Sequence, residues 1–593
     1  MFDQHAINAL VARVASQNTI VVTFTDRKAL AFALNWARHL QGVAVKGVLV
    51  GLMGMPRRTP LFAATERRLG MYGATVYPLP ASASSQGGRW FNVMPLLLTG
   101  KRVLVSDADV VWLRDPRPYL RALEAAHPRM DFAVSTDGEW ATDGRRLAGA
   151  PEELDVEGFS ACSSSMNIGI LSFAPGGRPG TRRAIAEVMA HLSLPGNMRR
   201  VDQGPINYRW KRGADGWRWR RTLHAVRDTA RGGAASGGAA SGRGGGKPRL
   251  CGLVNGSVVA GVLPIAQFGN MLTHGVLNLS APHQVQPIAV HATWLRSQHP
   301  TLKVWRLREY GFWFDERGWY EGRYLSYTPR VPPALLHAPF SLARHDDGTT
   351  ELPTAHLRLM HAQLSEFRNA LFLARLLHRA LILPPLLCGC EFGFHPRHVQ
   401  RDCRAHQHTT LPIPYVCAID HYLDPQAIER SSFALRERSF LANRRTPAAI
   451  RDDVVHVLSA DGTELRRDFH GRDATSTSSS LRRAASVRLP RVRPMSTALR
   501  TALAPHQHAR RLHIDDVLSA FGGFDGAENA SLVPSHDDAQ AILSSWCCTS
   551  QLAFRQTRGL VPYVLPPLEG QRQWRGGERR WVASALRAYT GTS

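Results

Sequence analysis

The sequence predicts an α/β protein: a mostly parallel sheet with helices on both faces, followed by a second α/β domain. Three observations support this. Apolar strands and amphipathic helices alternate over residues 1–230, and a second strand-and-helix unit begins at Leu357. Such alternation is typical of parallel sheets. The chain has 593 residues, which at roughly 100–200 residues per domain allows two to four domains.

The elements of the first domain follow one another in a regular order. Residues 19–24 form a β-branched run that predicts a strand, and apolar residues at helical spacing predict a helix over residues 30–40. Further strands are predicted at residues 44–53, 101–106, 131–135 and 167–173. Because sheets of this kind bind ligands at the carboxyl ends of their strands, candidate site residues are expected there.

Changes in composition divide the chain. We expect a first domain over residues 1–330, interrupted by a Gly/Ala/Ser-rich insertion at 231–247. A proline-rich segment predicts a linker at 331–350, and residues 351–593 form the C-terminal α/β domain, with a helix at 365–378 and a strand at 380–384. Residues 471–500 are rich in Ser, Arg and Pro, and we expect them to be mobile.

Charge alone does not reveal a partner. Lys and Arg number 73 against 47 Asp and Glu, a net charge of +26. The arginines are spread along the whole chain, and the sequence has no recognition helix, zinc-finger spacing or aromatic RNA-binding signature. We therefore expect no nucleic-acid partner. The sequence contains no run of 18 or more apolar residues, the length that would predict a membrane-spanning helix.

The cysteine pattern leaves three interpretations open. Cys388, Cys390, Cys403 and Cys417 lie near several histidines, which could form a zinc site, although the usual two-residue gap is missing. One or two disulfides, or buried thiols, explain the same residues.

The most specific local feature is Asp107-Ala-Asp109, directly after the predicted strand at 101–106. Two carboxylates in an extended turn can share a hard divalent cation, whose other positions accept diphosphate oxygens. The alternative is a strand end at which one carboxylate caps the following turn.

The surrounding segment, residues 104–119 (LVSDADVVWLRDPRPY), resembles the metal-binding signature of plant and algal nucleotide-sugar transferases of glycosyltransferase family 77. The resemblance is more specifically to the extensin arabinosyltransferases. Further blocks with counterparts in that family lie at residues 34–40, 49–53, 166–170, 202–207, 289–294, 361–385 and 545–548. The resemblance therefore runs in order along nearly the whole chain.

This resemblance implies a GT-A-like catalytic domain that uses a UDP-sugar with Mn²⁺ or Mg²⁺ and retains the anomeric configuration. It places Asp107 and Asp109 on the metal and the diphosphate, His291 as third metal ligand, and Lys303 on the diphosphate. From the residues alone, His291 could equally be a buried core histidine and Lys303 a solvated surface lysine.

The remaining site residues also come from the resemblance. Thr23 and Thr25 lie where a base and ribose would bind, although residues 24–27 depart from the plant pattern. Asn167 could contact sugar hydroxyls or satisfy a local turn. Asp202 and Gln203 would line the donor sugar, with Asp202 supporting a front-face displacement or an ion-pair intermediate.

The implied reaction moves a sugar, L-arabinofuranose in the first place, onto hydroxyproline-linked arabinosides of extensin-type cell-wall glycoproteins. The implied location is the Golgi lumen, with an N-terminal membrane anchor that we expect to lie outside this chain. Xylose or galactose transfer onto a wall polysaccharide, and a non-catalytic basic binding protein, stay open. Residues 361–385 also resemble the opening of fucosyltransferase-like units, where we favour a well-packed helix–strand pair over a second active site.

Overall fold

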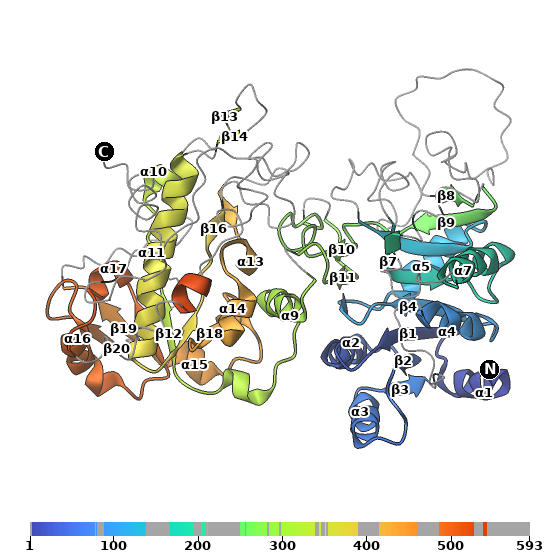
Figure 1. Cartoon of the computed structure of the whole chain (residues 1–593), viewed down its shortest axis with the longest axis horizontal. Helices are drawn as coiled ribbons and strands as arrows, with labels where there is room; N and C mark the ends of the chain where they lie inside the picture. Colours follow the sequence, from blue (N-terminus) through green and yellow to red (C-terminus); the bar gives the residue numbers. More distant parts are fainter. Residues whose placement is uncertain are drawn as a thin grey trace. The chain divides into compact units, whose positions relative to one another are not determined.

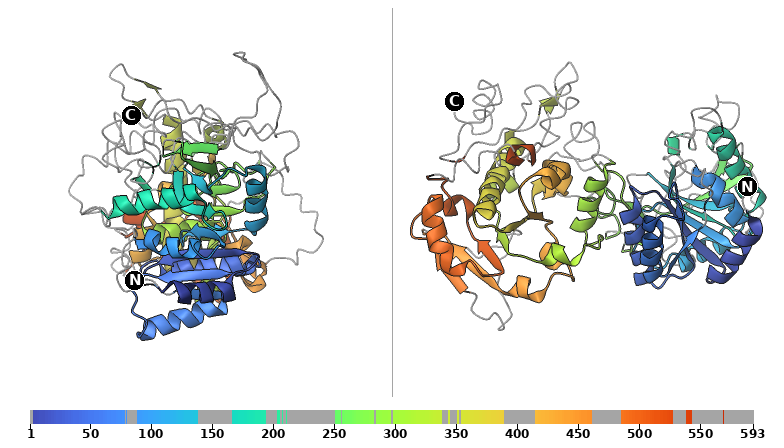
Figure 2. Two further views of the ribbon diagram at one scale, coloured as in Figure 1. Left: turned by 90° about the vertical axis from the view of Figure 1, so that its right-hand side faces the viewer. Right: turned by 60° about the horizontal axis from the view of Figure 1, so that its bottom comes forward.

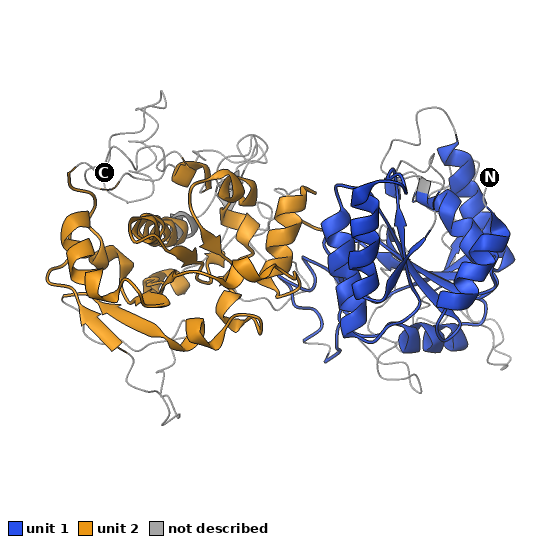
Figure 3. Ribbon diagram, turned by 90° about the horizontal axis from the view of Figure 1, so that it is seen from below, with its two compact units in different colours: residues 1–293 blue, residues 294–593 orange. Residues whose placement is uncertain are grey.

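A computed structural model divides the chain into two compact units, residues 1–293 and 294–593 (Figure 3). The structure describes residues 3–77, 79, 88–137, 166–193, 203–204, 207, 210, 250–254, 256–281, 284–295, 298–337, 343–344, 350–351, 354–388, 414–460, 485–526, 538–542 and 568.

Unit 1 is built on an eight-stranded sheet in the order β3-β2-β1-β4-β7-β6-β9-β8 (Figure 1). Its strands are β1 (Thr19–Thr25), β2 (Val48–Leu52), β3 (Ala74–Tyr77), β4 (Arg102–Ser106), β6 (Phe132–Thr136), β7 (Met166–Phe173), β8 (Leu250–Leu253) and β9 (Val258–Val262). Strands β1 to β4 are parallel, as predicted, whereas β7 runs antiparallel to both β4 and β6. The amino end of β7 therefore meets the carboxyl ends of β4 and β6.

Helices cover both faces of this sheet, because successive strand residues point to opposite sides. Ile20 and Val22 of β1 belong to one hydrophobic core, and Val21 belongs to the other. The first core is closed by α1 (Gln4–Val14), α4 (Gly88–Leu97) and α7 (Pro179–Leu192), and the second by α2 (Leu30–Gly42), α3 (Pro60–Met71) and α5 (Arg117–Ala126). The blue unit of Figure 3 shows these two helical layers.

A small second sheet in unit 1 joins distant parts of the sequence. It has the order β10-β11-β5, formed by β10 (Phe268–Asn270), β11 (Ala289–His291) and β5 (Val110–Trp112). Strand β5 begins directly after Asp109, and its antiparallel pairing with β11 sets His291 opposite Val110.

Unit 2 contains a six-stranded, fully parallel sheet in the order β18-β15-β12-β21-β19-β20. Its strands are β12 (Tyr324–Tyr327), β15 (Ala380–Ile382), β18 (Leu435–Arg436), β19 (Val454–Leu458), β20 (Ala485–Arg488) and β21 (Arg511–Ile514). The long helix α11 (Thr354–Leu376) packs on β12 and β15, and α9 (Pro300–Glu309) packs on α13 (Ile419–Tyr422) and α14 (Pro425–Arg430) (Figure 2). The smaller elements are α10 (Pro333–Leu336), β13 (Ala343–Arg344), β14 (Thr350–Glu351), β16 (Leu387–Cys388), β17 (Tyr415–Val416), α15 (Ala448–Asp452), α16 (Ser496–Leu503) and α17 (Val517–Ala520).

The boundary between the two units does not lie in the predicted linker. The units separate between Thr293 and Trp294, before the predicted linker at 331–350, because β12 is an inner strand of the second sheet. The expected mobile segment 471–500 is partly ordered, since residues 485–488 form β20 and α16 begins at Ser496. The helix predicted at 365–378 begins earlier, at Thr354. The insertion at 231–247 and residues 471–484 lie outside the described residues.

Cys388 of β16 and Cys417, next to β17, form a disulfide. For these two cysteines the disulfide interpretation is therefore correct. They cannot be zinc ligands in this state, because a bonded sulfur is no longer a thiolate. Cys390 and Cys403 lie outside the described residues. Within the described parts of the chain, no helix is long and apolar enough to cross a membrane.

Candidate active site

The two predicted aspartates lie in the turn between β4 and β5. The backbone N–H of Asp107 donates to the carbonyl of Gly169 on β7 (2.8 Å), and the N–H of Val110 donates to the carbonyl of Asp107 (3.2 Å). This turn carries the chain from the large sheet into the small one. It holds both carboxylates at the carboxyl edge of β4, where the sequence predicted a ligand site.

His291 reaches the aspartates from the end of β11. Its Nε2 lies 3.2 Å from Oδ1 of Asp109 and 3.5 Å from Oδ2 of Asp107. The β5–β11 pairing fixes this approach, and the N–H of Ala292 donates to the carbonyl of Asp109 (3.1 Å). The three side chains form a group whose potential ligand atoms all lie within 4.8 Å of one another.

Asn167 fixes the orientation of the His291 ring. Its Oδ1 accepts the backbone N–H of Gly169 (2.8 Å), and its Nδ2 donates to Oδ1 of Asp137 (2.6 Å). Nδ1 of His291 lies 3.1 Å from the same Oδ1. Because that oxygen is an acceptor, Nδ1 must carry the proton.

Nε2 of His291 consequently faces two carboxylates. In the neutral ring this nitrogen presents a lone pair, which repels Asp107 and Asp109 unless a positive charge lies between them. A proton or a cation can supply that charge. Metal-ligating histidines commonly have this arrangement, in which the second ring nitrogen donates to an oxygen behind it.

Gly169 leaves the room that this packing needs. A Cβ at this position would lie 2.2 Å from Cε1 of His291, 2.5 Å from its Nδ1 and 2.8 Å from Oδ1 of Asn167. Any side chain here would push the imidazole and the amide apart. The glycine within the predicted block at 166–170 therefore has a packing role beside the histidine.

Two further side chains extend the polar group. Arg89 of α4 forms an ion pair with Oδ1 of Asp107 through its Nη1. Gln203 donates from Nε2 to Oδ2 of Asp137 (2.5 Å). A continuous chain of contacts therefore runs from Gln203 through Asp137, Asn167 and His291 to Asp109. Asp202 lies outside the described residues.

The other predicted site residues, Thr23, Thr25 and Lys303, lie outside the group formed by Asp107, Asp109 and His291. Thr23 and Thr25 are at the carboxyl end of β1, and both are buried. The hydroxyl of Thr25 donates to the carbonyl of Asp26 (3.3 Å), whereas Oγ1 of Thr23 has no hydrogen-bond partner among the described residues. Lys303 lies on α9 in unit 2. Its contact with the diphosphate stays a prediction.

Sequence reasoning missed Asp137 and Arg89. Asp137 did carry a signal, because it follows a predicted strand as Asp107 does, and both strand ends lie at the same edge of the sheet. Arg89 carried none, since an arginine at the start of a helix is ordinary in so basic a chain.

Chemically, the site combines hard carboxylate oxygens, one imidazole nitrogen and neighbouring amide groups. Such a set suits a divalent cation of the manganese type. The amides of Asn167 and Gln203 can also donate to or accept from hydroxyl groups. These functions match the needs of a phosphorylated sugar donor.

Comparison with known proteins defines the class. Residues 92–304 match the nucleotide-diphospho-sugar transferase family, and this segment contains Asp107, Asp109, Asn167 and His291. The chain is a nucleotide-sugar glycosyltransferase, and most of the matched segment lies in the α/β fold of unit 1. Over 558 residues it is 24% identical to the arabinosyltransferase XEG113 of Arabidopsis thaliana, covering 90% of this chain and 74% of the relative. Together these matches confirm the resemblance to the extensin arabinosyltransferases of family 77.

Solved glycosyltransferases are more distant. GlyE of Streptococcus pneumoniae is 13% identical, with a TM-score of 0.27, covering 53% of this chain and 70% of that one. Mouse xyloside xylosyltransferase 1 is 10% identical, with a TM-score of 0.25, covering 46% and 97%. With both scores below 0.5, neither structure assigns a role to any residue here.

Proposed function

We propose that this protein is a metal-dependent retaining arabinosyltransferase. It transfers L-arabinofuranose from its UDP form to hydroxyproline-linked arabinosides of extensin-type cell-wall glycoproteins. The observation that carries the proposal is the meeting of Asp107, Asp109 and His291 inside the nucleotide-diphospho-sugar transferase segment. The arabinosyl donor is supported by the Arabidopsis relative, whose name gives that activity.

Asp107, Asp109 and His291 would hold the divalent cation. The presence of an imidazole favours Mn²⁺ over Mg²⁺, because Mg²⁺ prefers an all-oxygen set. When bound, the cation offsets the negative charge that develops on the departing diphosphate. The proton on Nδ1 of His291, held by Asn167, keeps Nε2 available as a ligand.

The neighbouring polar groups would bind and orient the donor. Gln203 and Asn167 both bond to Asp137, so their amides are held in fixed orientations beside the metal ligands. Preorganised donors of this kind favour the transition state without reorganisation during the reaction. Asp202, adjacent to Gln203, would support the developing positive charge on the sugar. Thr23 and Thr25 would lie near the base, and Lys303 on the diphosphate.

The Golgi lumen is the proposed location. The Cys388–Cys417 disulfide supports it, since such bonds persist in oxidising compartments and are rare in the cytosol. The acceptor is a hydroxyproline-rich glycoprotein reached in that compartment.

The test is a donor screen with purified protein. UDP-arabinofuranose, UDP-xylose and UDP-galactose are each incubated with Mn²⁺ or with a chelator, and UDP release and transfer to hydroxyproline arabinosides are measured. We expect Mn²⁺-dependent turnover with UDP-arabinofuranose above the other donors. Preference for xylose or galactose would replace the donor assignment, and no turnover with any donor would overturn the proposed activity.

A further inference from the structure

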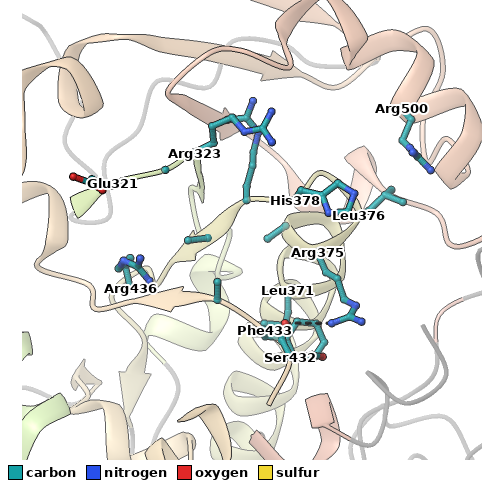
Figure 4. Close-up of a pocket in the computed structure, with 15 residues that line it drawn as sticks. Glu321, Arg323, Leu371, Arg375, Leu376, His378, Ser432, Phe433, Arg436 and Arg500 are labelled. Carbon is teal, nitrogen blue, oxygen red and sulfur yellow. Dashed lines mark hydrogen bonds between the residues drawn. The ribbon is translucent and has the colours of Figure 1, made fainter. Parts of the chain in front are cut away.

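Unit 2 contains a strongly basic cavity that the proposed reaction does not use. It has a volume of 570 Å³ and lies where three neighbouring parallel strands, β12, β15 and β18, begin. Five arginines and one histidine line it: Arg379, together with Arg323, Arg375, His378, Arg436 and Arg500, which are labelled in Figure 4.

Little negative charge balances these side chains. Glu321 is the one carboxylate among the lining residues, and it pairs with the exposed Arg317 at 2.9 Å. Among the described residues, none of Arg323, Arg375, Arg379 and Arg436 forms an ion pair with a carboxylate. Among the described residues that line it, the cavity therefore carries more cationic than anionic groups.

Two of the arginines have a structural role as well. Arg379 is buried and donates to four backbone carbonyls, those of Tyr324, His506, Gln507 and Ala509. Arg436 lies over the Trp319 ring, 4.1 Å from its centroid. Burial and then the charge of Arg323 lower the pKa of Arg379 to about 10, while Asp453 acts in the opposite direction. Burial also lowers the pKa of Arg436, against the opposing effects of Tyr324 and Glu437.

Arg323 and Arg375 are better placed to bind a ligand. Each donates one N–H to a backbone carbonyl, Arg323 to Gln507 (2.9 Å) and Arg375 to Ser432 (3.2 Å). A guanidinium carries five N–H groups, so both retain donors. Both side chains are partly exposed at the cavity.

The dipole of helix α11 explains only part of this basic cluster. Arg375, His378 and Arg379 lie at or just after the C-terminus of α11, where a helix dipole favours cations. That dipole is equivalent to only about half a negative charge. It can offset part of one arginine and leaves the others uncompensated.

We propose that this cavity binds a phosphate group of a small molecule. Planar guanidinium groups from different elements match phosphate oxygens in both charge and geometry. The site lies at the amino ends of the strands, away from the edge where α/β sheets usually bind ligands. The cavity belongs to unit 2 and Asp107 to unit 1, and the proposal does not depend on the proposed function.

The test is pyrophosphate binding by the full chain, measured by calorimetry in the presence of a chelator so that no divalent cation contributes. We expect one bound pyrophosphate in the wild type and in Asp107→Ala. The double variant Arg323→Gln/Arg375→Gln should bind at least about 100-fold more weakly, since each charged hydrogen bond contributes at least about tenfold. The matched control, Arg444→Gln, changes an exposed arginine outside the cavity and should bind as the wild type does.

Thermal unfolding checks that each variant is folded. If the double variant unfolds, Arg500→Gln on α16 provides a second test at an exposed position, with an expected loss of about tenfold. Displacement by glycerol phosphate would identify a soluble ligand, and displacement by phosphatidic acid vesicles a lipid headgroup; both support the site. No binding by the wild type, or an equal loss in Arg444→Gln, would overturn the proposal.

Discussion

Nδ1 of His291 lies 3.1 Å from the amide oxygen of Asn167, and this contact decides which ring nitrogen faces Asp107 and Asp109. The orientation of Asn167 is itself set by Gly169 and Asp137. The metal-binding capacity of the site therefore depends on residues that would not touch the metal.

Removing this amide should weaken metal binding. In Asn167→Ala the His291 ring loses the acceptor that fixes its protonation, and loss of such a supporting contact typically costs about 10–100-fold in metal affinity. Titration with Mn²⁺, followed by electron paramagnetic resonance, measures the change. Asn8→Ala, an exposed amide on α1, is the matched control. Unchanged Mn²⁺ affinity in Asn167→Ala would contradict the role given to this residue.

Gly169→Ala should damage the site by steric means. The added Cβ would lie within 2.5 Å of Nδ1 of His291, so the ring or the strand must shift. We expect loss of Mn²⁺ binding and a decrease of about 1–3 kcal/mol in the free energy of unfolding of unit 1. Gly42→Ala serves as the control, because a Cβ there would meet no atom within 4 Å. If both variants bind Mn²⁺ as the wild type does, the packing argument fails.

The disulfide should stabilise unit 2 without affecting the metal site. Cys388 and Cys417 are 29 residues apart in sequence, and closing a loop of this order contributes about 2–4 kcal/mol. Denaturant unfolding of Cys388→Ser/Cys417→Ser should show that loss. The Mn²⁺ affinity of unit 1 should stay constant, and equal stability of the double variant and the wild type would count against the prediction.

A buried carboxyl should make the stability of unit 2 depend on pH. Burial raises the pKa of Glu366 from 4.5 to about 7, although it accepts the backbone N–H of Arg330. The folded state then holds a proton that the unfolded state releases near pH 4.5, so stability falls as pH rises from about 4.5 to about 7. The total change is about 3 kcal/mol. Glu366→Gln should flatten this part of the curve of unfolding free energy against pH, and an unchanged slope would exclude Glu366 as its source.

Much of unit 1 could be predicted because its local patterns and its packing agree. Residues 19–24 and 101–106 are apolar on both faces, and β1 and β4 are indeed inner strands with helices on either side. The Asp107-Ala-Asp109 turn followed from the position of its strand. The approach of His291 to this turn came only from the family resemblance, since no local pattern reports a pairing between strands so far apart in sequence.

Other features depend on tertiary contacts that composition does not reveal. The predicted linker at 331–350 was placed by proline content. Tyr324–Tyr327 instead pairs with β15 and β21, and α9 packs on α13 and α14, so both belong to unit 2, which begins at Trp294. The ordered β20 was missed because its exposed residues resemble a loop. Asp137 could be noticed because it follows a predicted strand, but its bond to Asn167 depends on the meeting of the ends of β6 and β7.

The central claim is that Asp107, Asp109 and His291 support sugar transfer through a bound divalent cation. The most direct measurement compares the Mn²⁺-dependent turnover of UDP-arabinofuranose by the wild type and by Asp109→Ala. We predict that the variant stays folded and loses at least about 100-fold in turnover. Full Mn²⁺-dependent turnover by Asp109→Ala would contradict the assignment of the active site.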